Sequence, residues 1–199
     1  MRIIAGEFRG RKLLAPEGDV TRPITDRAKQ SLFDVLAPLM ADAVVYDCFA
    51  GTGSMGLECL SRGASHVTFF EADRSALARL HQNLAAVKAA DRATVIPGNL
   101  FQWFAREASR PQVPPLRADL VFLDPPYRFL TQHPDELLQL ALHLCHAHLK
   151  PDGLVIFRHD AKDQLALPHL RADDVRTYGE MMIELLRPEE NDVTGSAGH

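Results

Sequence analysis

One stretch of the sequence decides the fold, Asp47-Cys48-Phe49-Ala50-Gly51-Thr52-Gly53-Ser54-Met55-Gly56, which comes directly after the apolar residues 43–46. Its last six residues match the pattern G-x-G-x-x-G, whose glycines allow a tight turn from a buried strand into a helix. Bare backbone in such a turn lets a nucleotide-like ligand approach closely. A tight turn without a ligand is the alternative, but the acids Asp47 and Glu71, each ending a predicted strand, favour a binding site.

The residues around this stretch alternate between strand-like and helix-like patterns. We expect strands at residues 44–47, 66–71, 93–97, 119–124 and 154–158, and helices from about residue 26 and near 54–62, 75–89, 100–108 and 135–149. Gly63 and Gly153 are expected to end two of these helices. Apolar strands that alternate with helices predict an α/β fold, a parallel sheet covered on both faces. Two further runs, 174–178 and 181–186, predict an antiparallel hairpin at the sheet edge.

The bulk properties predict one cytoplasmic domain that acts as a monomer. The chain has 199 residues, 46% of them apolar, and only three cysteines. It contains no apolar run of 18 residues, so we expect no membrane span. The net charge is −4, yet residues 1–30 carry +3 and the remainder −7. A basic segment on an acidic body is compatible with phosphate contacts, although a solvated surface arm is an equal alternative.

Asp47 indicates which nucleotide-like ligand the loop prefers. A carboxylate directly before the loop would repel a pyrophosphate, which binds where a helix N-terminus is free of negative charge. It would attract the cationic amine of S-adenosylmethionine, so this cofactor is favoured over NAD. Glu71 is expected to accept hydrogen bonds from the ribose hydroxyls, and Asn99 to meet the adenine edge.

A second motif, Asp124-Pro125-Pro126-Tyr127, follows the fourth predicted strand. The exocyclic amine of a nucleobase is a poor nucleophile, because its lone pair is delocalised into the ring. Two acceptors aimed at its hydrogens, the Asp124 carboxylate and the Pro125 carbonyl, would free that lone pair. Tyr127 offers a face on which a flat base can stack. A strand that ends in an ordinary proline turn is the alternative interpretation.

These motifs, with Arg2-Ile3-Ile4-Ala5-Gly6 and Arg22-Pro23-Ile24-Thr25-Asp26-Arg27, resemble the bacterial 16S ribosomal RNA guanine-N2 methyltransferases over residues 1–188. The resemblance implies a Rossmann-like class I methyltransferase fold with a seven-stranded, mostly parallel sheet. The resemblance also implies methylation of a guanine within the small ribosomal subunit or an assembly intermediate of it. The methyltransferase domain would span residues 26–188. Glycines and prolines indicate a basic hairpin arm before it at 1–25, and polar, small residues indicate a disordered tail after it at 189–199.

The resemblance assigns roles to individual residues. Asp124, Pro125 and Tyr127 would act on the base. Expected cofactor contacts are Asp47, Phe49, Gly51, Gly53, Glu71, Asn99, Leu100 and Thr25, and expected RNA contacts are Arg9, Arg11, Lys12 and Arg22. No metal is expected: His143, Cys145, His146 and His148 resemble a ligand cluster, but they do not share one helix face.

Three other functions remain open at this point. An amino-methyltransferase acting on adenine N6 or on a protein glutamine more often carries Asn at position 124. A non-catalytic RNA-binding assembly factor would not need Asp124 and Tyr127. An NAD oxidoreductase is disfavoured by Asp47.

Overall fold

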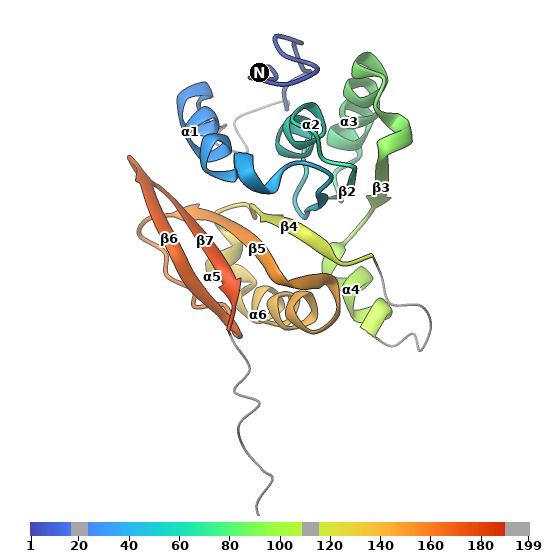
Figure 1. Cartoon of the computed structure of the whole chain (residues 1–199). Coiled ribbons are helices and arrows are strands. Elements are labelled where there is room, and N and C mark those ends of the chain that lie inside the picture. Colours follow the sequence, from blue (N-terminus) through green and yellow to red (C-terminus); the bar gives the residue numbers. More distant parts are fainter. Residues whose placement is uncertain (17–23, 109–115, 190–199) are drawn as a thin grey trace, which may run out of the picture.

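The computed structural model describes residues 1–16, 24–108 and 116–189, and these residues form three layers (Figure 1). The middle layer is a sheet that has seven strands within these ranges, in the order β3-β2-β1-β4-β5-β7-β6. The strands are β1 (Val44–Asp47), β2 (His66–Glu71), β3 (Ala93–Pro97), β4 (Ala118–Leu123), β5 (Leu149–Asp160), β6 (Leu170–Tyr178) and β7 (Met181–Pro188). Strands β1 to β5 run parallel to one another, whereas β7 is antiparallel to both β5 and β6. The predicted mostly parallel sheet and its edge hairpin are confirmed.

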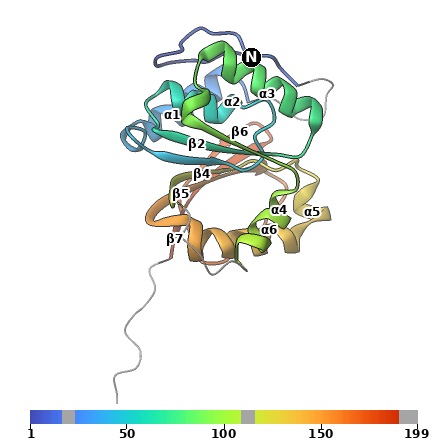
Figure 2. The same ribbon diagram turned by 90° about the vertical axis from the view of Figure 1, so that its right-hand side faces the viewer.

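Helices cover both faces of the sheet, as Figures 1 and 2 show. On one face lie α1 (Asp26–Leu36), α2 (Ser54–Ser61) and α3 (Arg74–Val87), and on the other lie α4 (Leu100–Ala108), α5 (Phe129–Gln132) and α6 (Pro134–His143). Short turns η1 (Ala37–Leu39), η2 (Ala90–Arg92) and η3 (Leu144–His148) complete the elements. Side chains alternate along each strand, so Val45 packs into one core and its neighbours Val44 and Tyr46 into the other. The result is a Rossmann-like α/β fold.

The end of α6 differs from the prediction. The helix expected at 135–149 ends at His143, five residues of π-helical turn follow, and β5 begins at Leu149 instead of residue 154. Leu149 is buried and pairs with Ala118, which draws this segment into the sheet. Gly153 therefore lies inside β5, and its predicted role as a helix cap is wrong. Gly63 does follow the end of α2 with a φ of 110°.

The start of the chain forms an arm that folds back on α2. Arg2 and Lys12 form an antiparallel bridge, and the turn between them rests on Ser61. Gly6 has a φ of 82°, and a Cβ atom there would lie 1.8 Å from the Ser61 carbonyl oxygen, so only glycine fits. The antiparallel bridge lies within the predicted hairpin arm, whereas residues 17–23 of that arm and residues 190–199 of the predicted tail at 189–199 lie outside the described residues. Among the described helices, none is long and apolar enough to cross a bilayer.

Candidate active site

The strand order reverses between β1 and β4, which is where open parallel sheets bind ligands, beyond the carboxyl ends of their strands. A cavity of about 610 Å³ lies there, a size typical of small-molecule sites. Its walls come from segments far apart in the sequence: the arm, the start of α1, the glycine loop, the Asp-Pro-Pro-Tyr segment and β5. The two motifs that the sequence singled out therefore meet in one cavity.

The glycine loop turns from β1 into α2. Gly51 and Gly53 have φ angles of 55° and 88°, a conformation that side chains disfavour. A Cβ atom on Gly53 would also lie 2.5 Å from Leu80 Cδ1, so α3 packs directly against this turn. Phe49 and Gly51 line the cavity, whereas Gly53 does not and packs against Leu80 of α3.

Asp47 ends β1 with its side chain almost fully buried. Its Oδ2 accepts a hydrogen bond from the Gly56 amide at 2.9 Å. Burial raises the pKa of this carboxyl to about 7, although the Gly56 hydrogen bond opposes the rise. Asp47 lines the cavity, and its ionised carboxylate is largely shielded from water there. Such a buried negative charge favours a cationic ligand group over a phosphate.

Three predicted cofactor residues lie beside the loop but outside the cavity lining. Glu71 accepts hydrogen bonds from the amides of Gly51 and Asp73, both at 2.7 Å. Asn99 accepts one from the Gln102 amide and so caps α4, whose first residue Leu100 is buried. Their contacts with a cofactor stay predictions.

Asp124 follows β4 directly and faces a partner that the sequence analysis missed. Arg158 on β5 donates from Nε to Asp124 Oδ1 at 2.6 Å, and its Nη2 lies 2.6 Å from Oδ2. Both residues line the cavity with Pro125, Pro126 and Tyr127. The sequence did contain a signal for Arg158, because a charged residue there directly follows the apolar run 154–157 of a predicted strand.

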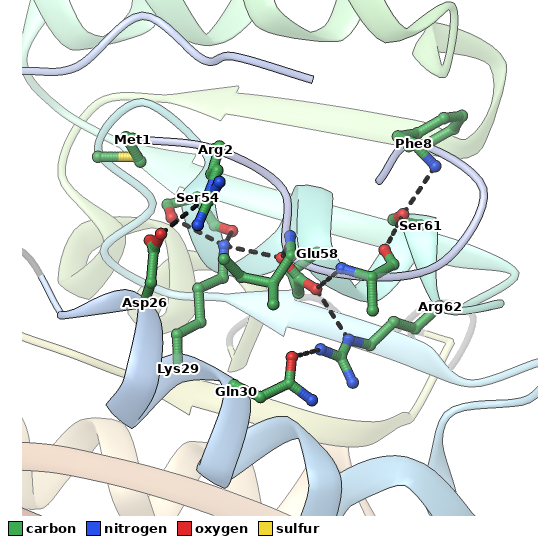
Figure 3. Close-up of polar contacts among 12 residues, drawn as sticks. Met1, Arg2, Phe8, Asp26, Lys29, Gln30, Ser54, Glu58, Ser61 and Arg62 are labelled. Carbon is green, nitrogen blue, oxygen red and sulfur yellow. Dashed lines mark hydrogen bonds and ion pairs between the residues drawn. The ribbon is translucent and has the colours of Figure 1, made fainter. Parts of the chain in front are cut away.

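The start of α1 forms another wall. Thr25 lines the cavity, but its hydroxyl already caps α1 by accepting from the Ala28 amide. Lys29 is buried, and its Nζ donates to the Ser54 carbonyl at 2.8 Å and lies 3.0 Å from Glu58 Oε2 (Figure 3). This ion pair was also missed, although Lys29 shares the buried stripe of α1 with Phe33 and Leu36.

The three described residues among the predicted RNA contacts lie away from the cavity lining. Arg9, Arg11 and Lys12 are exposed on the arm and do not line the cavity, whereas Arg2 does. Arg22 lies outside the described residues. Figure 3 shows the arm, through Arg2 and Phe8, lying against the elements that carry Lys29 and Glu58.

The histidine-rich segment after α6 has a packing role in the structure. The ring of His148 packs against Phe104 at a centroid distance of 4.8 Å, and burial lowers its pKa to about 4. The thiol of Cys145 instead lies 3.8 Å from the His169 carbonyl. Within residues 1–16, 24–108 and 116–189, no three His, Cys, Asp or Glu side chains are grouped closely enough to hold a metal ion.

Comparison with known proteins identifies the fold and the protein family of this chain. The fold is the Rossmann-like class I methyltransferase fold: a solved Escherichia coli structure described as "Putative methyltransferase yhhF" aligns with a TM-score of 0.79 and 32% identity, covering 95% of this chain and 98% of that one. The chain belongs to the family described as Conserved hypothetical protein 95, whose model matches residues 1–187.

Several relatives carry a more informative name, "Ribosomal RNA small subunit methyltransferase D". The protein from Escherichia coli strain K12 is 43% identical over 128 residues, which are 64% of this chain and 61% of the relative. The match thus spans less than two thirds of that relative's length. The protein from Haemophilus influenzae is 36% identical over 171 residues, 84% of this chain and 83% of the relative.

Proposed function

We propose that this protein transfers a methyl group from S-adenosylmethionine to the exocyclic N2 amine of a guanine in 16S ribosomal RNA of the small ribosomal subunit. The observation that carries the proposal is the meeting of Asp47 and Asp124-Pro125-Pro126-Tyr127 in one cavity. The first is a buried anion beside a glycine loop, and the second presents acceptors and an aromatic face.

The cofactor proposal rests on the chemistry of the loop. The methionyl amine of S-adenosylmethionine is cationic and would be a direct counterion for Asp47, on which Lys29 acts only as a charge in its surroundings. Gly51 exposes backbone to the cavity and leaves room for the sugar. Glu71 would reach the ribose hydroxyls by exchanging one of its two backbone hydrogen bonds.

The transfer step uses the second motif. The Asp124 carboxylate and the Pro125 carbonyl accept hydrogen bonds from the two amine hydrogens, and Tyr127 stacks on the base. The nitrogen lone pair forms the new N–C bond while the S–C bond breaks, and that bonding pair stays on sulfur. Sulfonium thereby becomes a neutral thioether, and the cationic nitrogen then loses one proton to water.

The substrate proposal has separate support. Relatives that cover most of this chain are named for the ribosomal small subunit, and the guanine N2 target follows from the motif resemblance. The exposed cations Arg9, Arg11 and Lys12 offer contacts for phosphates on an otherwise acidic chain.

The test is transfer of labelled methyl to four substrates: naked 16S rRNA, small subunits that lack this modification, DNA and bulk protein. Digestion of the product then identifies the nucleoside. N2-methylguanosine from the RNA or subunit sample is the expected result. N6-methyladenosine or labelled protein would overturn the target, and cofactor binding without any labelled product would overturn the enzymatic function.

The raised pKa of Asp47 predicts how cofactor binding depends on pH. The cationic amine binds the ionised carboxylate, so binding must first remove the proton that Asp47 holds below about pH 7. Affinity should therefore fall about tenfold for each pH unit below 7. Asp47→Asn keeps an acceptor for the Gly56 amide but removes the charge. We expect cofactor binding about 10- to 100-fold weaker than wild type near neutral pH, with this pH dependence lost.

Calorimetric titration with S-adenosylmethionine between about pH 5.5 and pH 7 measures this, because an α-amino group with a pKa of about 7.7–8.0 stays mostly protonated there. Asp42→Asn is the matched control, because Asp42 is exposed and lies just before the start of β1, at the end of the strand opposite to Asp47. It should bind like wild type. A flat pH profile in the wild-type protein would contradict the role of Asp47.

A further inference from the structure

The pair formed by Asp124 and Arg158 is fixed by the sheet register. Leu123 pairs with Phe157, so the next residues along β4 and β5 become neighbours across the sheet. The guanidinium occupies both carboxylate oxygens at 2.6 Å in a two-pronged arrangement. Such planar pairs fix the rotation of the carboxylate as well as its position. Only 18% of the Asp124 side chain and 12% of the Arg158 side chain are exposed.

Other titratable groups in the described part of the chain also act on this pair. Asp47, at the end of β1, is also negative when ionised and repels Asp124, and Tyr127 lies in the loop after β4. On α1, the positive charge of Lys29 lowers the pKa of Asp47, but its ammonium forms its ion pair with Glu58. Burial raises the pKa of Asp124 above its ordinary value, and the positive charge of Arg158 opposes that rise. Both oxygens of Asp124 lie 2.6 Å from guanidinium nitrogens, as in an ionised carboxylate–arginine pair, so Arg158 is the cation that opposes protonation of Asp124.

We propose that Arg158 is a positioning residue: it holds Asp124 as an ionised, fixed acceptor that orients the exocyclic amine of the substrate. This inference rests on the proposed function. A carboxylate oxygen has two lone-pair directions, so each oxygen held by the guanidinium can still accept a hydrogen bond from the amine. A carboxylate neutralised in this way is a weak base, and the proton released after methyl transfer goes to water.

The pair also explains why position 124 carries aspartate. An asparagine there would turn its amide NH₂ toward one of the Arg158 donors, which leaves two donors facing each other. Asparagine can serve at this position only where the facing cation is absent. Arg158 and Asp124 therefore form one unit in this chain.

The first test is a ¹³C NMR titration of the Asp124 carboxyl, assigned by comparison with Asp124→Asn. Arg158→Met should raise the pKa of Asp124 by about 1–3 units. The acid limb of kcat at saturating cofactor and RNA should move upward with it. Arg176→Met is the matched control, since it breaks another arginine–aspartate pair, with Asp174 on β6. It should leave both quantities unchanged, and an unchanged Asp124 pKa in Arg158→Met would overturn the proposal.

Two further variants decide the matter even where Arg158→Met does not fold. Arg158→Lys keeps the charge but not the fork, so kcat should fall about tenfold while the pKa of Asp124 stays near the wild-type value. Asp124→Asn should be slower than the double variant Asp124→Asn/Arg158→Met, because the second change removes the opposed donors. The reverse order, or a wild-type kcat in Arg158→Lys, would overturn the proposal.

The titration separates this proposal from the proposed function, because it needs no turnover. If Arg158→Met shifts the pKa of Asp124 but the wild-type protein methylates nothing, the charge-setting role of Arg158 is supported and the methyltransferase assignment is overturned. If the wild type transfers methyl groups but Arg158→Met leaves the pKa of Asp124 unchanged, the methyltransferase assignment is supported and the role of Arg158 is overturned.

Discussion

Replacing Asp124 by alanine is expected to slow methyl transfer at least about 100-fold while changing the affinity for S-adenosylmethionine only a few-fold. In the proposed transfer step Asp124 is one of two acceptors aimed at the reacting amine, and loss of one such preorganised group costs about 10²–10³ in rate. In the proposed function the cofactor is instead held by Asp47, which ends the neighbouring strand β1, and by the glycine loop that follows it. Single-turnover transfer of labelled methyl and calorimetric cofactor titration measure the two effects separately.

The matched control for Asp124→Ala is Asp119→Ala. Asp119 lies on the same strand, pairs with Lys150 at 2.6 Å and accepts a hydrogen bond from the Val44 amide, but it does not line the cavity. Its loss should lower stability and leave turnover per folded molecule near the wild-type rate. Because Asp124→Ala also leaves Arg158 without its carboxylate, Tm is recorded for both variants. Turnover near the wild-type rate in folded Asp124→Ala would remove this carboxylate from the mechanism.

The sequence predicts the sheet and its helical layers well, because both depend on local patterns. The segment from Val44 to Tyr46 is apolar at every position, as a strand buried on both faces must be. Thr25 has a side chain suited to a helix N-cap, and it caps α1. The end of α6 was mispredicted, since the pairing of Leu149 with Ala118 is a tertiary contact that helical periodicity does not reveal.

The site was predictable only where its residues stand in motifs. Asp47 and Asp124 each close a strand beside glycine or proline, so their neighbours in the sequence mark them. Arg158 lies 34 residues from Asp124, and Lys29 pairs with a carboxylate on a different helix. Such pairs arise when the sheet register and helix packing bring distant residues together, so a single sequence does not reveal them.

A buried carboxylate on α2 connects the arm with the glycine loop. Glu58 on α2 is completely buried and accepts from the Ile4 amide at 2.8 Å, from the Ala5 amide at 3.0 Å and from Arg62 Nε at 2.8 Å (Figure 3). It also pairs with Lys29, whose ammonium reaches the first residue of α2. A second link runs through Asn83, which bonds both Leu14 and Thr52. The position of the arm is thus coupled to the loop that lines the cavity.

Glu58→Gln should therefore lower the free energy of unfolding by about 3–5 kcal/mol, a large fraction of the roughly 5–15 kcal/mol typical of a domain. The glutamine amide would face donors, and the buried ammonium of Lys29 would lose its counterion. Urea denaturation measures the loss. We also expect the arm to detach, so trypsin should cut at Arg9 and Arg11 faster than in the wild type.

The pH dependence gives a second signature of the same carboxylate. Burial by itself raises the pKa of Glu58, but Lys29, the Ile4 amide and Arg62 outweigh it and hold that pKa below its ordinary value. A carboxyl whose pKa is lowered on folding adds stability above its unfolded pKa of about 4.3. That stability is lost as the pH falls through the lower folded pKa, and Glu58→Gln should lack this component of acid unfolding.

Two variants show whether the loss in Glu58→Gln comes from the uncompensated buried charge. Glu7→Gln breaks the exposed pair of the same arm with Arg92 and should cost no more than about 1 kcal/mol. The double variant Lys29→Met/Glu58→Gln removes the ammonium together with its partner and should recover part of the stability that Glu58→Gln loses. If the double variant is no more stable than Glu58→Gln, the arm is held by the hydrogen bonds that Glu58 accepts from the Ile4 and Ala5 amides, and the charge of Glu58 is not what holds it.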